Sequence, residues 1–337
     1  MPGILDGQPN LLLACAVSQA TLDLYTGAIA KFCDFCDARG VEVDLKSDPE
    51  LVDSAAADFC AEMCFGTKDK KPVNVALGMH LKAGLLNLHP GMRLPQLSRA
   101  VKSWERLKLG KEGEGFSEEV WALLLDYLAG ESLGAFGVAA AAVDLYLRGD
   151  DWAQIRASDL SASRVGGKWT VAVELGVVVR GETTKTGSNQ GVVVRRPWVA
   201  ALLGELKERA KKGGKLFPIS RPDFGRHWTA AVARLGLESV VGSPHSMRHA
   251  GATIDFHAGV PLAEIKLRGR WESDKSVSRY TKAHVLARCN SHLSPTLARR
   301  AKELLADPQR LVDRALARSV DNAPKPCARR PLANLTL

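Results

Sequence analysis

Long apolar runs are absent from the sequence. No stretch of 18 uninterrupted apolar residues occurs, so we expect no transmembrane helix and no membrane partner. No basic region precedes the short apolar segment near the first residue, and we therefore expect no signal peptide. Seven cysteines, an odd number spread over 337 residues, do not make a disulfide framework. These absences predict an intracellular protein with reduced thiols.

Two common devices of phosphate chemistry are also missing. The sequence contains no GxxxxGK[ST] loop, which would bind nucleotide phosphates through its backbone. Gly187 and Ser188 lie in a turn, but without the lysine and the following helix of that motif. No cluster of carboxylates could hold the metal pair of a two-metal nuclease. We therefore expect chemistry that uses no cofactor and no metal ion.

Four cysteines near the start have the spacing of zinc ligands. Cys33 and Cys36 form one pair, and Cys60 and Cys64 form another. Cys36, however, lies on the apolar stripe of a predicted helix, and Cys60 flanks Phe59 on the next. Structural zinc pairs usually occupy knuckle turns. We favour packed thiols, and metal binding by these cysteines stays open as the alternative.

Positive charge is concentrated in the later part of the chain. Residues 1–64 carry a net charge of −8, residues 65–115 carry +6, and residues 116–337 carry +11. A basic excess of this kind is expected of a surface that meets nucleic-acid phosphates. Solubility alone explains a mild excess about as well. Charge therefore permits nucleic-acid binding without requiring it.

Length and composition predict two globular domains. The charged and glycine-rich segment 108–115 has the character of a linker. Four helical patterns precede it, at 18–40, 51–63, 73–88 and 94–108. We therefore predict a helical domain over residues 10–107. A second domain should cover 116–305, and the segment 306–337, which contains helix breakers, should form a partly disordered tail.

The second domain is predicted to be mostly α-helical with a small antiparallel β-sheet, which makes the fold class α+β. Ser117 begins a helix as its cap, and an alanine-rich helix follows. Three β-branched runs then predict an antiparallel meander, at 168–175, 176–187 and 190–197. Further helices are predicted at 197–210, 223–235, 246–258 and 262–268.

The most informative residues lie between positions 243 and 284. His245 and Arg248 are one helical turn apart, Trp271 follows 23 residues later, and Tyr280 follows nine after that. Tyr280 stands among basic and small polar residues, which makes it the candidate nucleophile. The other tyrosines lie on apolar stripes of predicted helices: Tyr25, Tyr127 and Tyr146.

This spacing resembles the C-terminal motif of the tyrosine recombinase (phage integrase-like) family, which is His-x-x-Arg, a His or Trp, and then the tyrosine. The segment LYLRGDDWAQIRASDL is similar to the family's first-arginine motif, with Arg148 at the arginine position and Asp151 at the acidic position. The turn TKTGSNQG has Lys185 where the family has its catalytic lysine. The first predicted helix is similar to the start of the family's helical core-binding (SAM-like) domain. The resemblance covers roughly residues 18–305.

The chemistry explains why such residues are needed. A DNA phosphodiester is an anion, so an attacking phenolate is repelled while charge builds on the non-bridging oxygens. The guanidinium groups of Arg148 and Arg248 would bind those oxygens in bidentate fashion. His245 would donate to the same oxygens or help to move the tyrosine proton.

The remaining two positions complete the set that the resemblance implies. Trp271 stands where many members carry histidine. Its indole N–H can donate one hydrogen bond to the phosphate but cannot shuttle a proton. Lys185 would protonate the leaving 5′-oxygen. Attack by Tyr280 would then store the bond energy in a 3′-phosphotyrosine, so that strand rejoining requires neither ATP nor metal.

The resemblance implies site-specific cutting and rejoining of double-stranded DNA by a homotetramer, for integration or excision of a mobile element. Such a protein works where DNA is, in the nucleus of a eukaryote or in the cytoplasm or nucleoid of a bacterium or phage host. Two other interpretations stay open. One is an inactive DNA-binding relative, and the other is a type IB topoisomerase or telomere resolvase. Filled chemical positions and a compact two-domain length favour a recombinase.

A short helix is predicted at 294–305, after Tyr280. Ser294 and Pro295 provide a cap and a first-turn proline, and an apolar stripe follows. A helix this short must bury its stripe against something. The family docks a helix after the tyrosine into a neighbouring protomer. Docking within the chain itself is the alternative, and the sequence favours neither.

Overall fold

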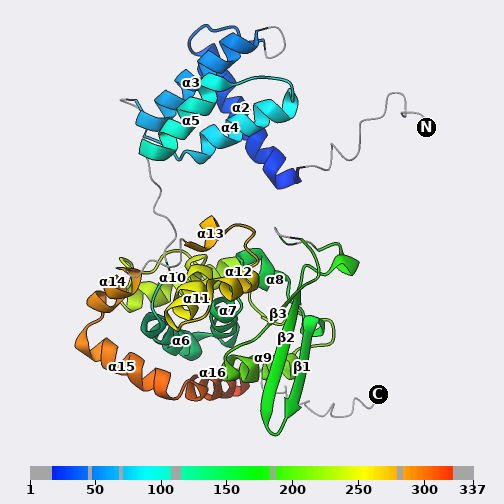
Figure 1. Ribbon diagram of the computed structural model, residues 1–337, viewed down its shortest axis with the longest axis vertical. Coiled ribbons are helices and arrows are strands. Elements are labelled where there is room, and N and C mark those ends of the chain that lie inside the picture. Colours follow the sequence, from blue (N-terminus) through cyan, green and yellow to red (C-terminus); the bar gives the residue numbers. More distant parts are fainter. Residues whose placement is uncertain are drawn as a thin grey trace, which may run out of the picture. The chain divides into compact units, whose positions relative to one another are not determined.

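The computed structural model describes residues 17–44, 48–67, 71–107, 115–182, 184, 187–278 and 284–321. The chain divides into two compact units, with the boundary between Glu112 and Gly113. Helices dominate both, and one three-stranded antiparallel sheet belongs to the second, so the predicted fold class is confirmed (Figure 1). Among the described helices, none combines the length and the apolar character that crossing a membrane requires.

The described residues of the first unit form four helices that fall on the four predicted segments: α2 (Gln19–Asp37), α3 (Pro49–Phe65), α4 (Ala76–Leu88) and α5 (Pro95–Leu107). Helix α2 begins where expected, because the Ser18 side chain accepts from the Thr21 N–H. Phe32, Phe59 and Trp104 are fully buried where the helices meet. The apolar stripes that predicted the helices are therefore the faces that pack together in the core.

A buried carboxylate caps α5 from a distance. Asp53 of α3 is 2% exposed and accepts from the backbone N–H groups of Gln96 and Leu97, each at 2.8 Å. These are donors of the first turn of α5, which have no partner within the helix. Asp53 thereby fixes α5 against α3.

Three of the described cysteines of the first unit lie among its core residues. Cys36, Cys60 and Cys64 are buried, and Cys33 is exposed. Burial raises the pKa of the Cys60 thiol to about 12. In the part of the chain that the structure describes, no three histidines, cysteines or carboxylates are grouped closely enough to hold a metal ion. The three buried thiols therefore contribute to packing.

The second unit is built around helix α7 (Leu133–Asp144). Every residue of α7 from Gly134 to Asp144 is buried, beneath α6 (Glu118–Glu131), α9 (Pro197–Arg209), α10 (Arg221–Arg234), α11 (Ser246–His257) and others. Small side chains let the neighbouring helices approach closely. Gly251 of α11 shows how close, since a Cβ there would lie 2.1 Å from the Val143 carbonyl oxygen.

The sheet covers one side of this unit (Figure 1). Its order is β1 (Leu160–Val165), β2 (Lys168–Leu175) and β3 (Gln190–Val193), with both pairs antiparallel. Gly166 and Gly167 join β1 to β2, both with positive φ, as a tight hairpin requires. Helix α9 packs against β2, and its Gly204 leaves room for the ring of Trp169.

Among the described residues of 176–187, the predicted strand does not form. Gly176 and Gly181 have φ values of 66° and 68°, which end the extended conformation, and a short 3₁₀ turn, η2 (Val178–Arg180), lies between them. Val179 is 95% exposed, so this β-branched run buries no apolar face. The third strand is β1 instead. Its polar sequence carries little of the alternation that marks a half-buried strand.

Shorter elements complete the second unit: α8 (Gly149–Gln154), η1 (Ala157–Asp159), α12 (Leu262–Gly269), α13 (Asp274–Ser278) and α14 (His284–His292). Two C-terminal helices, α15 (Pro295–Ala306) and α16 (Gln309–Asp321), then run back along α6 (Figure 1).

The helix predicted at 294–305 docks within its own chain. Ala301 and Leu304 of α15 are buried in the core of the second unit. Arg300 of α15 and Arg314 of α16 both form ion pairs with Asp126 of α6, at 3.2 and 2.7 Å. The structure thus has the intramolecular arrangement of the two that the sequence left open.

Helix α16 lies in the segment that the sequence analysis assigned to the tail. Leu311, Val312 and Ala315 are nearly fully buried in the core of the second unit. Their spacing of one and three residues places them on one face of a helix. Asp307 and Pro308 interrupt the chain only briefly. The second unit therefore extends one helix beyond the predicted boundary at 305.

Candidate active site

The centre of the candidate site is the carbonyl oxygen of Tyr146, just after α7. Tyr146 is fully buried and has a φ of 51°, a left-handed conformation that a side chain other than glycine rarely adopts. The turn directs its carbonyl oxygen toward two arginines. That oxygen accepts from Nη1 of Arg248 and from Nη2 of Arg270, the latter at 3.2 Å. One carbonyl thus joins two cations that are 22 positions apart in sequence.

The side chain of Tyr146 is held in place by a second set of contacts. Its hydroxyl donates to Asp255 of α11 at 2.6 Å, and its ring lies 5.8 Å from that of Trp271. Burial, followed by the charge of Asp255, raises the pKa of the Tyr146 phenol. Tyr146 therefore stays protonated and acts as a structural anchor.

Arg248 lies in the first turn of α11 and is 2% exposed. Its Nη1 and Nη2 donate to the backbone carbonyls of Tyr146 and Gly269. The Cζ atom stands 4.6 Å from the centroid of the Trp271 ring, in a cation–π contact. These three contacts fix the plane of the guanidinium.

Trp271 follows α12 and depends on the glycine two residues before it. A Cβ at Gly269 would lie 1.8 Å from the Trp271 ring. No other residue type could occupy position 269 with the indole where it is. Trp271 is half-buried and stacks between Arg248 and Tyr146. Sequence reasoning selected Trp271 by its spacing, and the structure places it against Arg248.

Arg148 joins the same group through a carboxylate. Asp151 of α8 accepts at one oxygen, Oδ2, from the Arg148 backbone N–H at 2.9 Å and from Arg270 Nη2 at 2.8 Å. The Asp151 side chain is 3% exposed. The Nη1 atom of Arg148 is buried and finds no hydrogen-bond partner in the described part of the chain. Arg148, Arg248 and Arg270 are therefore connected through Asp151 and Tyr146.

His245 lies on another wall of this region. It immediately precedes α11, is exposed, and has its ring 4.9 Å from that of His249. It lines a groove of about 650 Å³ together with Leu147 and Gly149, the two neighbours of Arg148 in sequence. The structure thus places His245 beside the chain that carries Arg148.

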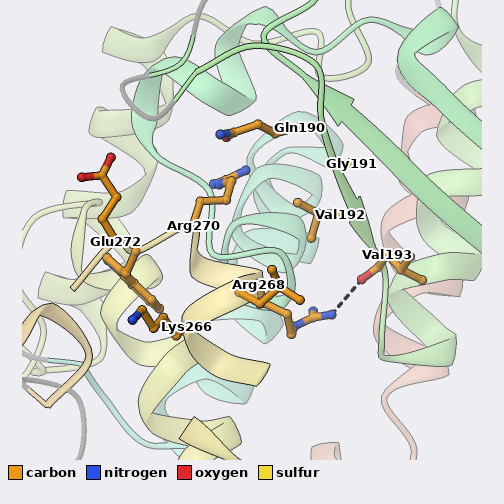
Figure 2. A pocket seen from close by; sticks show the side chains of 10 residues that line it. Gln190, Gly191, Val192, Val193, Lys266, Arg268, Arg270 and Glu272 are labelled. Carbon is orange, nitrogen blue, oxygen red and sulfur yellow. Dashed lines mark hydrogen bonds between the residues drawn. The ribbon is translucent and has the colours of Figure 1, made fainter. Parts of the chain in front are cut away.

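A pocket of about 580 Å³ opens next to Trp271, between β3 and the end of α12 (Figure 2). Arg268 ties these two walls together, since its Nη1 donates to the Val193 carbonyl at 2.9 Å and its Nη2 to the Asp144 carbonyl at 2.7 Å. Arg270 and Gln190 line the same pocket (Figure 2). The cationic group around Arg270 is therefore next to a cavity.

A buried ionic network supports the site from beneath. Asp144, at the end of α7, is fully buried and accepts from the backbone N–H groups of Arg195 and Arg196 at 3.0 and 3.1 Å. Arg196 donates through Nη1 to Asp144 and through Nη2 to Asp255, each at 3.0 Å. Because Asp255 also holds Tyr146, the network links the sheet and α9 to the carbonyl that joins the arginines.

Lys185 and Tyr280 lie outside the described residues. On either side of Lys185, Thr184 and Gly187 pair through two backbone hydrogen bonds of 2.9 and 3.1 Å. Three residues before Tyr280, Val277 is 3% exposed and belongs to a small apolar cluster with Tyr146. Val277 of α13 is therefore packed in the same apolar cluster as Tyr146.

Of the six predicted residues, the structure brings Arg148, Arg248 and Trp271 together and puts His245 on an adjoining groove. Sequence reasoning missed Arg270, which stands immediately before Trp271. The one sequence signal was its position at the end of a predicted helix, after Gly269, where a left-handed residue is common.

Solved structures with a similar fold are recombinases. The XerH site-specific recombinase, bound to a palindromic difH substrate in a post-cleavage complex, matches with a TM-score of 0.57 and 13% identity. The match covers 80% of this chain and 79% of XerH. A lambda integrase dimer bound to a COC′ core site matches with a TM-score of 0.53 and 14% identity, over 80% of this chain and 91% of the integrase. No protein-family model and no curated protein matches the sequence.

Proposed function

From the tyrosine recombinase fold of this chain, we propose that the protein cuts and rejoins double-stranded DNA at specific sites. One observation carries the proposal beyond the fold. Arg148 and Arg248, 100 positions apart, are connected through Tyr146, Arg270 and Asp151, and Trp271 lies against Arg248. Arginines gathered in this way beside a pocket, which Arg270 and Trp271 line, are suited to a phosphodiester.

In the proposed reaction, the phenolic oxygen of Tyr280 attacks the scissile phosphorus. A bond forms between them, and the bond from phosphorus to the 5′-oxygen breaks. Lys185 gives a proton to the departing 5′-oxygen, while Arg148 and Arg248 stabilise the charge on the non-bridging oxygens. The product is a 3′-phosphotyrosine and a free 5′-hydroxyl. Attack of a 5′-hydroxyl on the phosphotyrosine reverses these steps and restores the DNA backbone.

Two further residues assist this reaction in the proposal. His245, exposed on its groove, would donate to a phosphate oxygen or accept the proton of Tyr280. The indole N–H of Trp271 would donate a single hydrogen bond to the phosphate. His245 shares its groove with Leu147 and Gly149, which flank Arg148 in sequence, and Trp271 lies against Arg248.

Integration or excision of a mobile element by a homotetramer on DNA is the role that fits this chemistry. Basic residues of the segment 65–115 would supply phosphate contacts from the first unit. They are Lys68, Lys70, Lys71, Lys82, Arg93, Arg99, Lys102, Arg106, Lys108 and Lys111. The protein would act wherever its DNA is kept.

The test is trapping of a covalent adduct. Nicked duplex substrates drawn from the genomic DNA flanking the gene are incubated with the full chain, and adducts are separated by denaturing electrophoresis. We expect adducts with the wild type and with Tyr127→Phe, a control that also removes one phenol, but none with Tyr280→Phe. DNA affinity should be nearly unchanged in both variants, because each loses a single hydroxyl. Adducts that map by peptide mass to another tyrosine would refute the assignment.

A second assay separates recombination from the other outcomes of the same chemistry. Two duplexes that carry the cleaved site are mixed with the wild type, and exchanged products are measured alongside relaxation of a supercoiled plasmid. Exchange between duplexes supports a recombinase. Relaxation without exchange would point to a topoisomerase, and DNA binding without adducts to an inactive relative.

A further inference from the structure

Arg270 occupies a backbone position that usually belongs to glycine. It ends α12 with φ 54° and ψ 43°, which is the left-handed conformation. Helices commonly end in this way, and glycine is preferred there because it has no Cβ to clash with the following carbonyl. An arginine in that conformation is strained. Such strain persists where the surroundings require the side chain, and it often marks functional positions.

The Arg270 side chain is buried but only partly satisfied. It is 7% exposed, and its Nη2 donates to Asp151 and to the Tyr146 carbonyl. Its Nε and Nη1 are buried as well, and neither has a hydrogen-bond partner among the residues that the structure describes. Buried donors of a charged group are rarely left unused, because water has been removed from them. Two donors of one guanidinium therefore have no acceptor among the described residues.

The charges around Arg270 indicate that the acceptor is an anion. Arg148 has one more buried donor, Nη1, without a partner in the described chain. Asp151 forms an ion pair with Arg270 but accepts only the backbone N–H of Arg148, so the Arg148 guanidinium is not neutralised by that carboxylate. Burial, and to a lesser extent the charge of Arg148, lower the pKa of Arg270, while Asp151 opposes them. An anion with several oxygens would satisfy the donors and balance the charge.

We infer that Arg270 is a third guanidinium of the active site and binds the scissile phosphodiester together with Arg148. This inference rests on the proposed function for the identity of the anion. Arg270 uses Nη2 to hold Asp151 and Tyr146, which leaves the N–H groups of Nε and Nη1 to donate to phosphate oxygens. Hydrogen bonds from a charged donor to a charged acceptor are the strong ones. Arg270 and Trp271 line the adjacent pocket, so an anion in that pocket would lie beside the Arg270 side chain.

The first test compares cleavage of charged and neutral phosphates. Single-turnover adduct formation is measured for the wild type, Arg270→Gly, and Arg226→Ala, which removes an arginine that is 76% exposed. We expect Arg270→Gly to cut an ordinary substrate on the order of 10²-fold more slowly, as for loss of an oxyanion donor, and Arg226→Ala to stay near the wild-type rate. On a substrate with a methylphosphonate at the scissile position, the deficit should largely disappear, because that centre carries no charge. If Arg270→Gly were slowed equally on both substrates, Arg270 would act only as a structural partner of Asp151, and the inference would be overturned.

The two substitutions at position 270 are chosen so that the variants keep the native fold. Glycine suits the left-handed position, so Arg270→Gly keeps the backbone, and thermal unfolding checks this. Arg270→Lys provides a second route, since it keeps a charge beside Asp151 but loses the planar fork. It should also cut the charged substrate more slowly than the wild type. A Lys variant with the wild-type rate would show that charge alone suffices and would overturn the contact through the Nε and Nη1 donors.

The second test needs no DNA. Inorganic phosphate is titrated into the full chain, and the midpoint of thermal unfolding is followed. An anion that binds the native state raises the midpoint. We expect a rise for the wild type and for Arg226→Ala, and a clearly smaller one for Arg270→Gly. An equal rise in all three would overturn the anion site. If phosphate stabilisation depends on Arg270 but no DNA gives an adduct with the wild type, the proposed function fails while the anion site stands.

Discussion

The guanidinium of Arg248 lies over the indole ring of Trp271, with 4.6 Å between Cζ and the ring centroid. A cation–π contact of a desolvated arginine contributes about 1–2 kcal/mol, which is comparable to a tenfold change in rate. Trp271→Phe keeps an aromatic face under Arg248, whereas Trp271→Leu does not. We expect the Leu variant to form adducts about tenfold more slowly than the Phe variant in single-turnover assays. Equal rates would mean that the aromatic face does not orient Arg248.

The close contact between α7 and α11 makes a prediction about stability. In Gly251→Ala the new Cβ would overlap the Val143 carbonyl oxygen and the ring of Tyr146, at 2.1 and 2.6 Å. We expect a loss of about 3 kcal/mol or more in the free energy of unfolding of the second unit, measured with urea. Gly225→Ala in α10 is the matched control. Its Cβ meets nothing within 4 Å, so it should stabilise the protein by about 0.5–1 kcal/mol through helix propensity. Similar effects of the two substitutions would contradict the packing described.

A cluster of charges beside the sheet should make stability depend on acid pH. Arg180 donates to Asp159 at 2.7 Å and to Glu182 at 2.8 Å. Burial by itself would raise the pKa of Asp159, but hydrogen bonds from Arg180 and from the Arg156 N–H outweigh it, and the pKa lies below the ordinary 3.8. Hydrogen bonds from Arg180 also hold the pKa of Glu182 below its ordinary value.

These two lowered pKa values determine how the free energy of unfolding changes with pH. A carboxyl group whose pKa is lower in the folded state stabilises the protein fully above its unfolded pKa, and this contribution is lost as the pH falls through the folded pKa. We therefore expect the free energy of unfolding to fall between roughly pH 5 and pH 2, and to fall less steeply in Arg180→Met. Arg310→Met, at an arginine that is 84% exposed, serves as the control. Parallel pH profiles for the wild type and Arg180→Met would exclude this cluster as the cause.

Lys185 is predicted to protonate the leaving group. Lys185→Ala should cut ordinary DNA poorly, because a 5′-alkoxide leaves slowly without a proton. Cleavage should recover on a substrate with sulfur in place of the bridging 5′-oxygen, since a thiolate leaves unprotonated. Lys302→Ala, at an exposed lysine of α15, provides a control for the loss of one positive charge elsewhere. If the sulfur substrate fails to rescue Lys185→Ala, the lysine is not the general acid.

The elements that the sequence predicted well are those with a strong apolar period or a clear cap. The Ser18 and Ser117 side chains each accept the N–H that their capping role requires. In the segments that were predicted wrongly, the spacing of the apolar residues is weak or misleading. The β-branched run 177–179 resembles a strand, but the glycines at 176 and 181 turn it into a 3₁₀ segment on the surface. Helix α16 was missed because its four-residue apolar face follows an Asp-Pro pair.

At the site, spacing in the sequence identified side chains but could not show what holds them. His245 and Arg248 were expected on one helical face, and yet one is exposed and the other is nearly fully buried. Their separation arises because His245 precedes the first turn of α11. The roles of Tyr146 and Arg270 depend on positive φ values that only the folded backbone reveals. Tertiary contacts, such as the shared oxygen of Asp151, have no local signature in the sequence.

The return of α16 to α6 and α7 has a consequence for synthesis on the ribosome. Roughly 200 residues separate the start of α6 from the end of α16, so translation at about 5–20 residues per second takes about 10–40 s between them. During that time the apolar faces of α6 and α7 lack the side chains of α16 that finally cover them. The four helices of the first unit can assemble much earlier from near neighbours in sequence. A nascent chain therefore acquires its first unit well before the core behind Arg148 and Arg248 closes, and a chain released early would carry these two arginines on an incompletely folded second unit.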